Sequence, residues 1–186
     1  MNTIICDVDG VAADLLTPWL GRYNKDYDDN VKPSDIKDWG THVFLKPECG
    51  LKFYDYLEDP TLYDEVLPNK DCLNFCNEMR GVGWRIVFAT VTPISCFGIK
   101  YKWLVKHKFL ADNQLEDFVE IKDKTLLRGA ADILIDDGIH NTHPWYTAGR
   151  TPILYRQPYN ENKVVPYFHT NFWEKIFDIC NQGYSQ

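Results

Sequence analysis

The sequence lacks the features of several common protein classes. No apolar stretch among its 186 residues approaches the roughly 20 residues that a membrane-spanning helix needs. Lys and Arg number only 20 against 27 Asp and Glu, and a net charge of -7 does not suit a protein that grips long nucleic acid by its phosphates. The first residues carry no basic segment, and Asp7 interrupts their apolar run. We therefore expect no membrane span, no long nucleic acid as partner and no secretory signal.

Metal-binding and disulfide patterns are also missing. None of the six cysteines belongs to a CxxC pair or stands with histidines at the spacing of a zinc site. His140 and His143 have no third ligand at a suitable spacing, so we expect them in a loop rather than at a metal ion. The cysteines are expected to be reduced, buried thiols of a cytoplasmic protein.

Apolar residues, by contrast, are plentiful. Hydrophobic residues make up 45% of the chain and aromatics 15%, which is typical of a folded domain and not of a disordered one. Short apolar runs typical of buried strands alternate with segments of helical periodicity. The predicted strands span residues 3–6, 85–90, 118–121, 131–135 and 151–155, and the predicted helices span residues 71–80, 99–109 and 171–180. This alternation predicts an α/β protein with a doubly wound parallel sheet.

Polar side chains stand where the predicted strands end. Asp7 and Asp9 follow the first strand, and Thr90 closes the second. Asp136 and Asp137 follow a later strand. Parallel sheets bind ligands in the crevice at the carboxyl ends of their strands, so these residues are expected to meet at one edge. Buried acids are costly without a partner, and an oxygen-rich group of acids suits Mg²⁺.

Such a group of side chains can cleave a phosphate ester. A carboxylate beside Mg²⁺ can attack phosphorus and form an aspartyl-phosphate. A second acid, two residues further on, can protonate the leaving oxygen and later activate water. A threonine hydroxyl and a lysine ammonium can hold the phosphoryl oxygens as their charge shifts. Gly10 lets the chain turn sharply after the acids.

Four features follow one another along the chain: the DxDGV segment at 7–11, Thr90 after an apolar strand, a lysine, and the acid pair at 136–137. They resemble the four motifs of the haloacid dehalogenase superfamily of phosphatases. Longer segments extend the match, namely DVDGVAAD at 7–14, FAT at 88–90 with TPI at 92–94, KYKW at 100–103, DKT at 123–125, ADILIDD at 131–137 and FWE at 172–174. These segments resemble the 5'(3')-deoxyribonucleotidase family, which implies a Rossmann-like fold with a small cap inserted after the first strand. The resemblance spans most of the chain and is thinnest over residues 20–60.

The resemblance implies roles for the acids. Asp7 is expected to be the nucleophile and a ligand of Mg²⁺. Asp9 is expected to be the general acid and base, and to offer its backbone carbonyl to the metal. The spacing from Asp137 to Asn141 fits the family and favours Asp137 as the direct metal ligand, with Asp136 behind it and bonded to a lysine. The opposite assignment of Asp136 and Asp137 stays open.

The resemblance also implies roles for a threonine and two lysines. Thr90 is expected to bind the phosphate, Lys124 to balance the charge of the acids, and Lys100 to contact the substrate. The segment after Thr90 is one residue longer than in the family, which makes Thr92 a second candidate for the phosphate. Gly138 stands where the family often has a basic residue, which bears on substrate preference more than on the chemistry.

A cap is expected between the first motif and the rest. We expect residues 1–14 and 68–186 to form the α/β core, and residues 15–67 to form a small, mainly helical cap. A cap excludes water from an aspartyl-phosphate site and recognises the leaving group.

Aromatic residues are concentrated in this cap segment. Nine of the 27 aromatics lie there, and such rings can either stack on a nucleobase or fill the core of the cap. Trp39, Phe44 and Phe53 are the candidates for contact with a base, because polar residues flank them. Leu15, just after the first motif, is the candidate for contact with the sugar.

The first hypothesis is thus a Mg²⁺-dependent phosphatase of deoxyribonucleoside monophosphates, carrying the phosphate at either the 5' or the 3' position. The alternative is a phosphatase of the same fold that acts on another small phosphate ester. A third hypothesis is a nucleotide-binding module without catalysis, and the presence of both Asp7 and Asp9 counts against it. The base, the sugar and the oligomeric state, a homodimer included, stay open.

Overall fold

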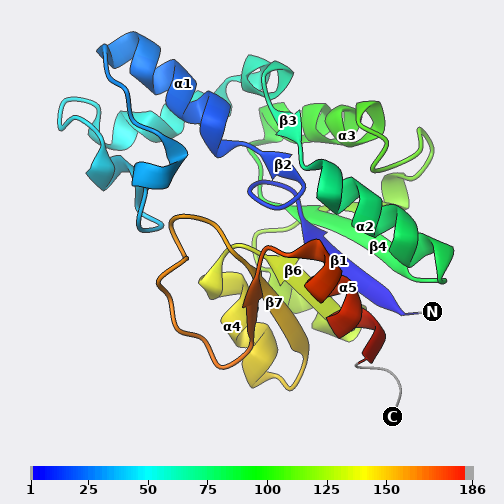
Figure 1. The fold of residues 1–186 in the computed structure, drawn as a ribbon. Helices are drawn as coiled ribbons and strands as arrows, with labels where there is room; N and C mark the ends of the chain where they lie inside the picture. The colour runs from blue at the N-terminus through cyan, green and yellow to red at the C-terminus, as the bar shows by residue number, and fades with distance from the viewer. Residues whose placement is uncertain (1, 183–186) are drawn as a thin grey trace.

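The computed structural model describes residues 2–182 and contains a six-stranded parallel sheet with the order β5-β4-β1-β6-β7-β8. Its strands are β1 (Thr3–Asp7), β4 (Arg85–Thr90), β5 (Phe118–Glu120), β6 (Ile133–Asp136), β7 (Thr151–Tyr155) and β8 (Phe168–Thr170). The α-helices are α1 (Leu16–Tyr27), α2 (Lys70–Gly81), α3 (Phe97–Lys106), α4 (Ile139–Thr147) and α5 (Trp173–Gln182). The predicted doubly wound α/β fold is confirmed (Figure 1).

The sheet separates two hydrophobic clusters. Ile4 and Cys6 of β1 belong to the larger cluster, whereas Ile5 belongs to the smaller one together with Trp145 of α4. Successive side chains of a strand point to opposite faces, so an apolar strand such as β1 is buried only when helices cover both faces. The larger cluster also receives side chains of α2, α3 and α5.

The cap segment (residues 15–67) leaves the sheet after β1 and returns before α2. Two short strands, β2 (Ala13–Asp14) and β3 (Leu67–Pro68), pair antiparallel where it leaves and returns. Between them lie α1 and the 3-10 helices η1 (Pro33–Asp35), η2 (Thr41–Phe44), η3 (Gly50–Glu58) and η4 (Pro60–Asp64). Figure 1 shows this segment beyond the carboxyl end of β1. Its buried side chains belong to the same hydrophobic cluster as one face of the sheet.

Some local predictions were wrong. The sequence analysis missed α4 and β8, so His140 and His143 lie on a helix and not in a loop. Pro144 lies inside α4 and obscures the helical pattern, because proline removes a backbone hydrogen bond. The six cysteines are buried and unpaired, as predicted. Within residues 2–182, no helix combines the length and the apolar character that crossing a bilayer requires.

Candidate active site

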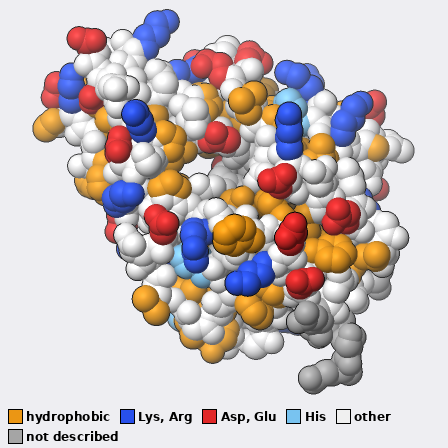
Figure 2. All heavy atoms as spheres, viewed as in Figure 1, with side chains coloured by type: hydrophobic (Ala, Val, Ile, Leu, Met, Phe, Trp, Pro, Cys, Tyr) orange, Lys and Arg blue, Asp and Glu red, His pale blue; other side chains and the backbone are white. Residues whose placement is uncertain are grey.

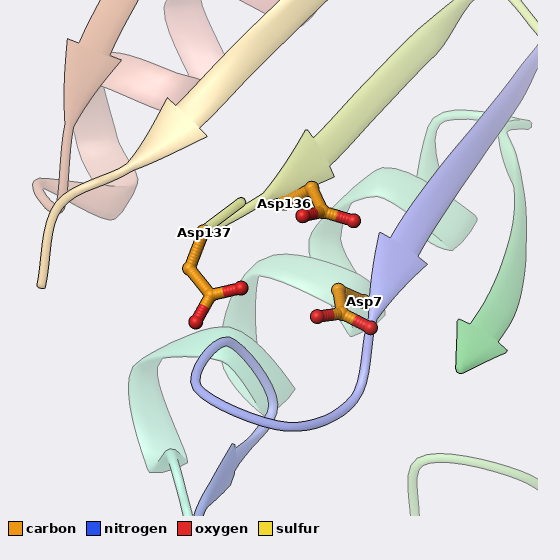
Figure 3. Close-up of side chains that lie close together, drawn as sticks. All are labelled: Asp7, Asp136 and Asp137. Carbon is orange, nitrogen blue, oxygen red and sulfur yellow. The ribbon is translucent and has the colours of Figure 1, made fainter. Parts of the chain in front are cut away.

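Three carboxylates converge at the carboxyl edge of the sheet. Asp7 ends β1, Asp136 ends β6, and Asp137 comes next in the chain. The parallel pairing of Cys6 with Ile135 brings Asp7 and Asp136 side by side. One oxygen from each of the three carboxylates lies within 4.8 Å of the others, and Figure 3 shows the side chains facing a common space.

Lys124 joins two of these carboxylates. Its Nζ donates to Asp7 Oδ1 and to Asp136 Oδ2, both at 2.6 Å, and the side chain is only 2% exposed. It opens the short 3-10 helix η7 (Lys124–Gly129), and its backbone carbonyl accepts a hydrogen bond from Trp145 Nε1 of α4 at 3.1 Å. Burial lowers the pKa of Lys124, but the two carboxylates outweigh it and raise that pKa overall. A fixed positive charge therefore lies beneath the acids.

The carboxylate of Asp136 is fully engaged by the protein. Besides Lys124, it accepts hydrogen bonds from the backbone N–H of Gly138 at 2.8 Å and from Asn141 Nδ2 at 3.1 Å to each oxygen. A Cβ at position 138 would lie 2.6 Å from the ring of His140 and 3.1 Å from Asp136 Oδ1. A larger residue at position 138 would therefore require the His140 side chain to move.

Asp137 is surrounded differently. It is 3% exposed, and no Lys or Arg within residues 2–182 forms an ion pair with its carboxylate. The hydroxyl of Tyr159 donates to Asp137 Oδ2. Burial, followed by the charges of Asp7 and Asp136, raises the pKa of Asp137 well above its ordinary value. Burial also raises the pKa of Asp7 to about 7, although Lys124 opposes the shift.

These acids fit a divalent cation. Three buried carboxylates, those of Asp7, Asp136 and Asp137, lie beside the single ammonium of Lys124, which forms ion pairs with Asp7 and Asp136 only. Burial and mutual repulsion raise the pKa values of Asp7 and Asp137, so their charged forms need a further positive charge. A hard cation with oxygen ligands would supply the missing positive charge. The residues present therefore suit such an ion.

Asp9 has its own set of partners. Its Oδ2 accepts hydrogen bonds from Lys100 Nζ of α3 and, at 3.3 Å, from Thr90 Oγ1 at the end of β4. Lys100 also donates to Thr90 Oγ1 at 3.0 Å and is buried. The hydroxyl of Tyr63, from η4 in the cap segment, donates to Asp9 Oδ1. The fold thus brings Asp9, Thr90 and Lys100 together, although they are far apart in the sequence.

The structure separates the two candidate threonines. Thr90 is engaged by Lys100 and Asp9. Thr92 is 7% exposed, and its Oγ1 has no hydrogen-bond partner in the part of the chain that the structure describes. An unpartnered buried hydroxyl is costly, so a ligand oxygen at Thr92 would satisfy a group that the protein leaves unsatisfied.

The candidates for base contact differ in exposure. Trp39 is 51% exposed, and Phe44 is partly buried at the end of η2. Phe53 is 0% exposed and stacks on Trp19 with ring centroids 4.1 Å apart. The prediction that Phe53 contacts a base is therefore corrected. Its ring is fully buried inside the cap segment and has no exposed surface for a ligand. Leu15 is buried at the start of this segment.

Two tyrosines of the site were missed by the sequence analysis. Tyr63 and Tyr159 each donate a hydroxyl hydrogen bond to an acid of the motifs, Asp9 and Asp137 respectively. Neither tyrosine belongs to a recognisable motif, and each meets its acid only through the fold. Figure 2 shows the molecular surface hollowed between the cap segment and the core.

Comparison with known proteins gives a consistent result. A family model described as "5' nucleotidase, deoxy (Pyrimidine), cytosolic type C protein" matches residues 1–182. A curated 5'(3')-deoxyribonucleotidase of Clostridium acetobutylicum is 31% identical over 135 residues, which are 73% of this chain and 72% of that protein. Another, from Bacillus subtilis, is 26% identical over 177 residues, which are 94% of this chain and 96% of that protein.

Solved structures show the same fold. A haloacid dehalogenase family hydrolase of Deinococcus radiodurans, with bound phosphate and sodium, has a TM-score of 0.66 at 9% identity, over 98% of this chain and 96% of that one. A haloacid dehalogenase-like hydrolase of Streptococcus pneumoniae has a TM-score of 0.65 at 11% identity, over 97% and 98% of the two chains. At these identities the likeness concerns the fold alone.

Proposed function

Because this chain belongs to the family of deoxy (pyrimidine), cytosolic type C 5' nucleotidases, we propose that it hydrolyses deoxyribonucleoside monophosphates to deoxyribonucleosides and phosphate. It is a phosphoric monoester hydrolase, as are the relatives named 5'(3')-deoxyribonucleotidase. The observation that carries the proposal is the convergence of Asp7, Asp136 and Asp137 beside Asp9 with its lysine and threonine.

The proposed cofactor is Mg²⁺, held by the carboxylates of Asp7 and Asp137 and the backbone carbonyl of Asp9. Asp136 is the weaker candidate for direct coordination, because Lys124, Gly138 and Asn141 already occupy its oxygens. When bound, Mg²⁺ would neutralise the acids and polarise the phosphoryl group.

The proposed first step uses both acids of the first motif. A carboxylate oxygen of Asp7 attacks phosphorus and forms an aspartyl-phosphate, while the ester P–O bond breaks. The leaving oxygen of the nucleoside takes a proton from Asp9. The ammonium of Lys100, which bonds to both Asp9 and Thr90, is the proposed cationic contact for the phosphate of the substrate.

The second step reverses the role of Asp9. Its carboxylate takes a proton from water, the water oxygen attacks phosphorus, and the bond to Asp7 breaks with release of inorganic phosphate. Lys124 keeps Asp7 in place in both steps, since it also bonds to the buried Asp136. Thr90 and Thr92 are the proposed hydroxyl donors to the phosphoryl oxygens.

Recognition of the nucleoside is assigned to the cap segment. Trp39 and Phe44 are the proposed contacts with the base, and Leu15 is the proposed contact with the sugar. Of the aromatics predicted for this role, Trp39 has the largest free surface. We also propose a cytoplasmic location, because all six cysteines are unpaired thiols.

A phosphate-release screen tests the proposal. The panel comprises nucleoside and deoxynucleoside monophosphates, with the phosphate at the 5' or the 3' position, and sugar phosphates. We expect the highest kcat/KM for a deoxyribonucleoside monophosphate, and loss of turnover with EDTA. A higher kcat/KM for a sugar phosphate would overturn the proposed substrate.

The variant Asp7→Asn tests the mechanism separately. It should lower kcat by at least about a thousandfold, because nucleophile substitutions cause losses of this size or larger, while circular dichroism shows a folded protein. An Asp7→Asn protein that keeps full activity would exclude the aspartyl-phosphate route.

A further inference from the structure

Tyr159 is the feature of the site that no motif accounts for. It lies in the connection between β7 and β8, and its hydroxyl donates to Asp137 Oδ2. Throughout residues 2–182, no other side chain donates a hydrogen bond to this carboxylate and no cationic side chain forms an ion pair with it. The orientation of the Asp137 carboxylate therefore depends on one tyrosine.

The turn that carries Tyr159 is tied to the edge of the sheet. Asn160 Nδ2 donates to the backbone carbonyls of Asp137 and Tyr155, both at 2.8 Å, and Asn160 is buried. Gln157 Nε2 donates to the backbone carbonyl of Gly10. The turn is closed by the Gln157 N–H, which donates to Asn160 Oδ1 at 2.9 Å. These bonds hold the hydroxyl of Tyr159 at a fixed place relative to Asp137.

Gly10, in the loop of the first motif, closely approaches the contact between Tyr159 and Asp137. Gly10 has a φ of +81°, and a Cβ there would overlap Asp137 Oδ2 and lie 2.7 Å from the Tyr159 hydroxyl oxygen. Three segments far apart in the sequence therefore meet at van der Waals distance: the loop of the first motif, the end of β6 and the turn 157–160. The loop of the first motif therefore packs closely against both the Asp137 carboxylate and the Tyr159 hydroxyl.

The cap segment reaches the same turn. The ring of Trp39 packs edge-on against Tyr159, with centroids 5.5 Å apart, and against His140, with centroids 4.8 Å apart. Beside it, Lys163 Nζ forms an ion pair with Asp38 Oδ2 at 2.8 Å. The loop of the cap segment around Asp38 and Trp39, the cap tip, thus packs directly against Tyr159.

We propose that Tyr159 is a positioning residue that holds the Asp137 carboxylate ready for a divalent cation, and that Trp39 supports it from the cap segment. Groups that hydrogen-bond to a metal ligand orient that ligand, and their loss costs roughly 10- to 100-fold in metal affinity or activity. The inference rests on the proposed function in one respect, namely that Asp137 is a cation ligand. The contact between Trp39 and Tyr159 should then strengthen cation binding at Asp137, and a bound cation should strengthen that contact, because coupling between two sites is reciprocal.

Calorimetric titration of the metal-free protein with Mg²⁺ tests this without measuring activity. Tyr159→Phe should raise the Kd for Mg²⁺ by about tenfold or more. The matched control is Tyr167→Phe, because Tyr167 lies in the same connection but its hydroxyl bonds to Thr142 at 3.0 Å. The control should bind Mg²⁺ like the wild-type protein. The Mg²⁺ concentration required for phosphate release should shift in Tyr159→Phe by the same factor as the Kd.

Two further variants separate the inference from the proposed function. Asp137→Asn should abolish Mg²⁺ binding, and Trp39→Ala should weaken it by less than Tyr159→Phe does. Wild-type affinity in Tyr159→Phe, together with loss of binding in Asp137→Asn, would overturn the positioning role and leave the proposed function intact. Wild-type affinity in Asp137→Asn would overturn the metal assignment itself, and unchanged affinity in Trp39→Ala would overturn the support from the cap segment.

Discussion

The edge of the sheet and the cap segment position their side chains by different means. At the sheet edge, β1, β4 and β6 deliver Asp7, Thr90 and Asp136 at their last residues, and parallel pairing fixes which of them are neighbours. The cap segment has one α-helix and four 3-10 helices between β2 and β3, and ring packing decides which aromatics are buried. The pairing register of the strands therefore fixes the position of a residue at the sheet edge. In the cap segment, the position of an aromatic residue depends on which of several similar rings packs into the interior.

The largest effect that would test this comparison is expected at Lys124. Lys124→Met removes the buried cation between Asp7 and Asp136, so we expect phosphate release to fall by about 10²–10³-fold or more. The free energy of unfolding should fall by about 3–5 kcal/mol, because breaking a buried ion pair leaves its partners uncompensated. Urea unfolding measures this, with the exposed Lys122→Met as control. Equal stability of the two variants would contradict a sheet edge held by ion pairs.

A second test contrasts two aromatics of the cap segment. Phe53→Ala should lower the free energy of unfolding by about 3–5 kcal/mol, because the ring is fully buried, while KM stays close to that of the wild-type protein. Phe44→Ala should be less destabilising, because Phe44 is partly buried, and should raise KM if this ring contacts the base. Phe53→Leu serves in place of Phe53→Ala if the alanine variant does not fold. A rise in KM for either Phe53 variant in its folded form would restore Phe53 as a substrate contact.

The smallest of the three effects is a pH dependence at the sheet edge. Burial raises the pKa of Asp7 from 3.8 to about 7, so between these values the folded protein holds a proton that the unfolded chain has lost. The stability of the metal-free protein due to this group therefore falls as pH rises through that window. A cation competes with the same proton, so the increase in Tm caused by Mg²⁺ should grow from about pH 6 to about pH 8.

Thermal unfolding with and without Mg²⁺ at each pH measures this increase. In Asp7→Asn the increase should be smaller and should depend less on pH, because one of the two acids with a raised pKa is gone while Asp137 remains. An increase that is the same at both ends of the range in the wild-type protein would contradict the raised pKa of Asp7.

The sequence predicted those parts of the molecule in which a local pattern, such as an apolar run followed by an acid, also determines where the residue lies in the fold. The bounds of β4 and β7 agree with the predicted strands, and acids that follow apolar runs do end parallel strands. Phe53 and Trp39 cannot be told apart in this way, since both are aromatics with polar neighbours in a segment without regular periodicity. Phe53 stacks on Trp19, which lies on another helix, whereas Trp39 contacts His140 and Tyr159 of the core.

Hydroxyl partners could not be predicted for a related reason. Tyr63 lies 54 residues from Asp9, and Tyr159 lies 22 residues from Asp137. No periodicity links such pairs, because the contacts arise only after the sheet and the connecting turns have formed. The missed helix α4 illustrates the opposite case, in which a local signal, Pro144, opposes a helix that packs Trp145 against the sheet.

The hydrophobic cluster that runs from β1 into the cap segment limits how substrate can enter. Trp19, Phe53 and Leu62 of the cap segment belong to the same cluster as Ile4 and Cys6, so the segment cannot swing away from the sheet as a rigid lid without exposing this shared interior to water. Local opening requires the least free energy around Asp38 and Trp39, because an exposed ion pair and the edges of aromatic rings hold this loop against the core. Substrate exchange would then depend on local opening of a short loop, while the rest of the cap segment melts together with the core in a single cooperative transition.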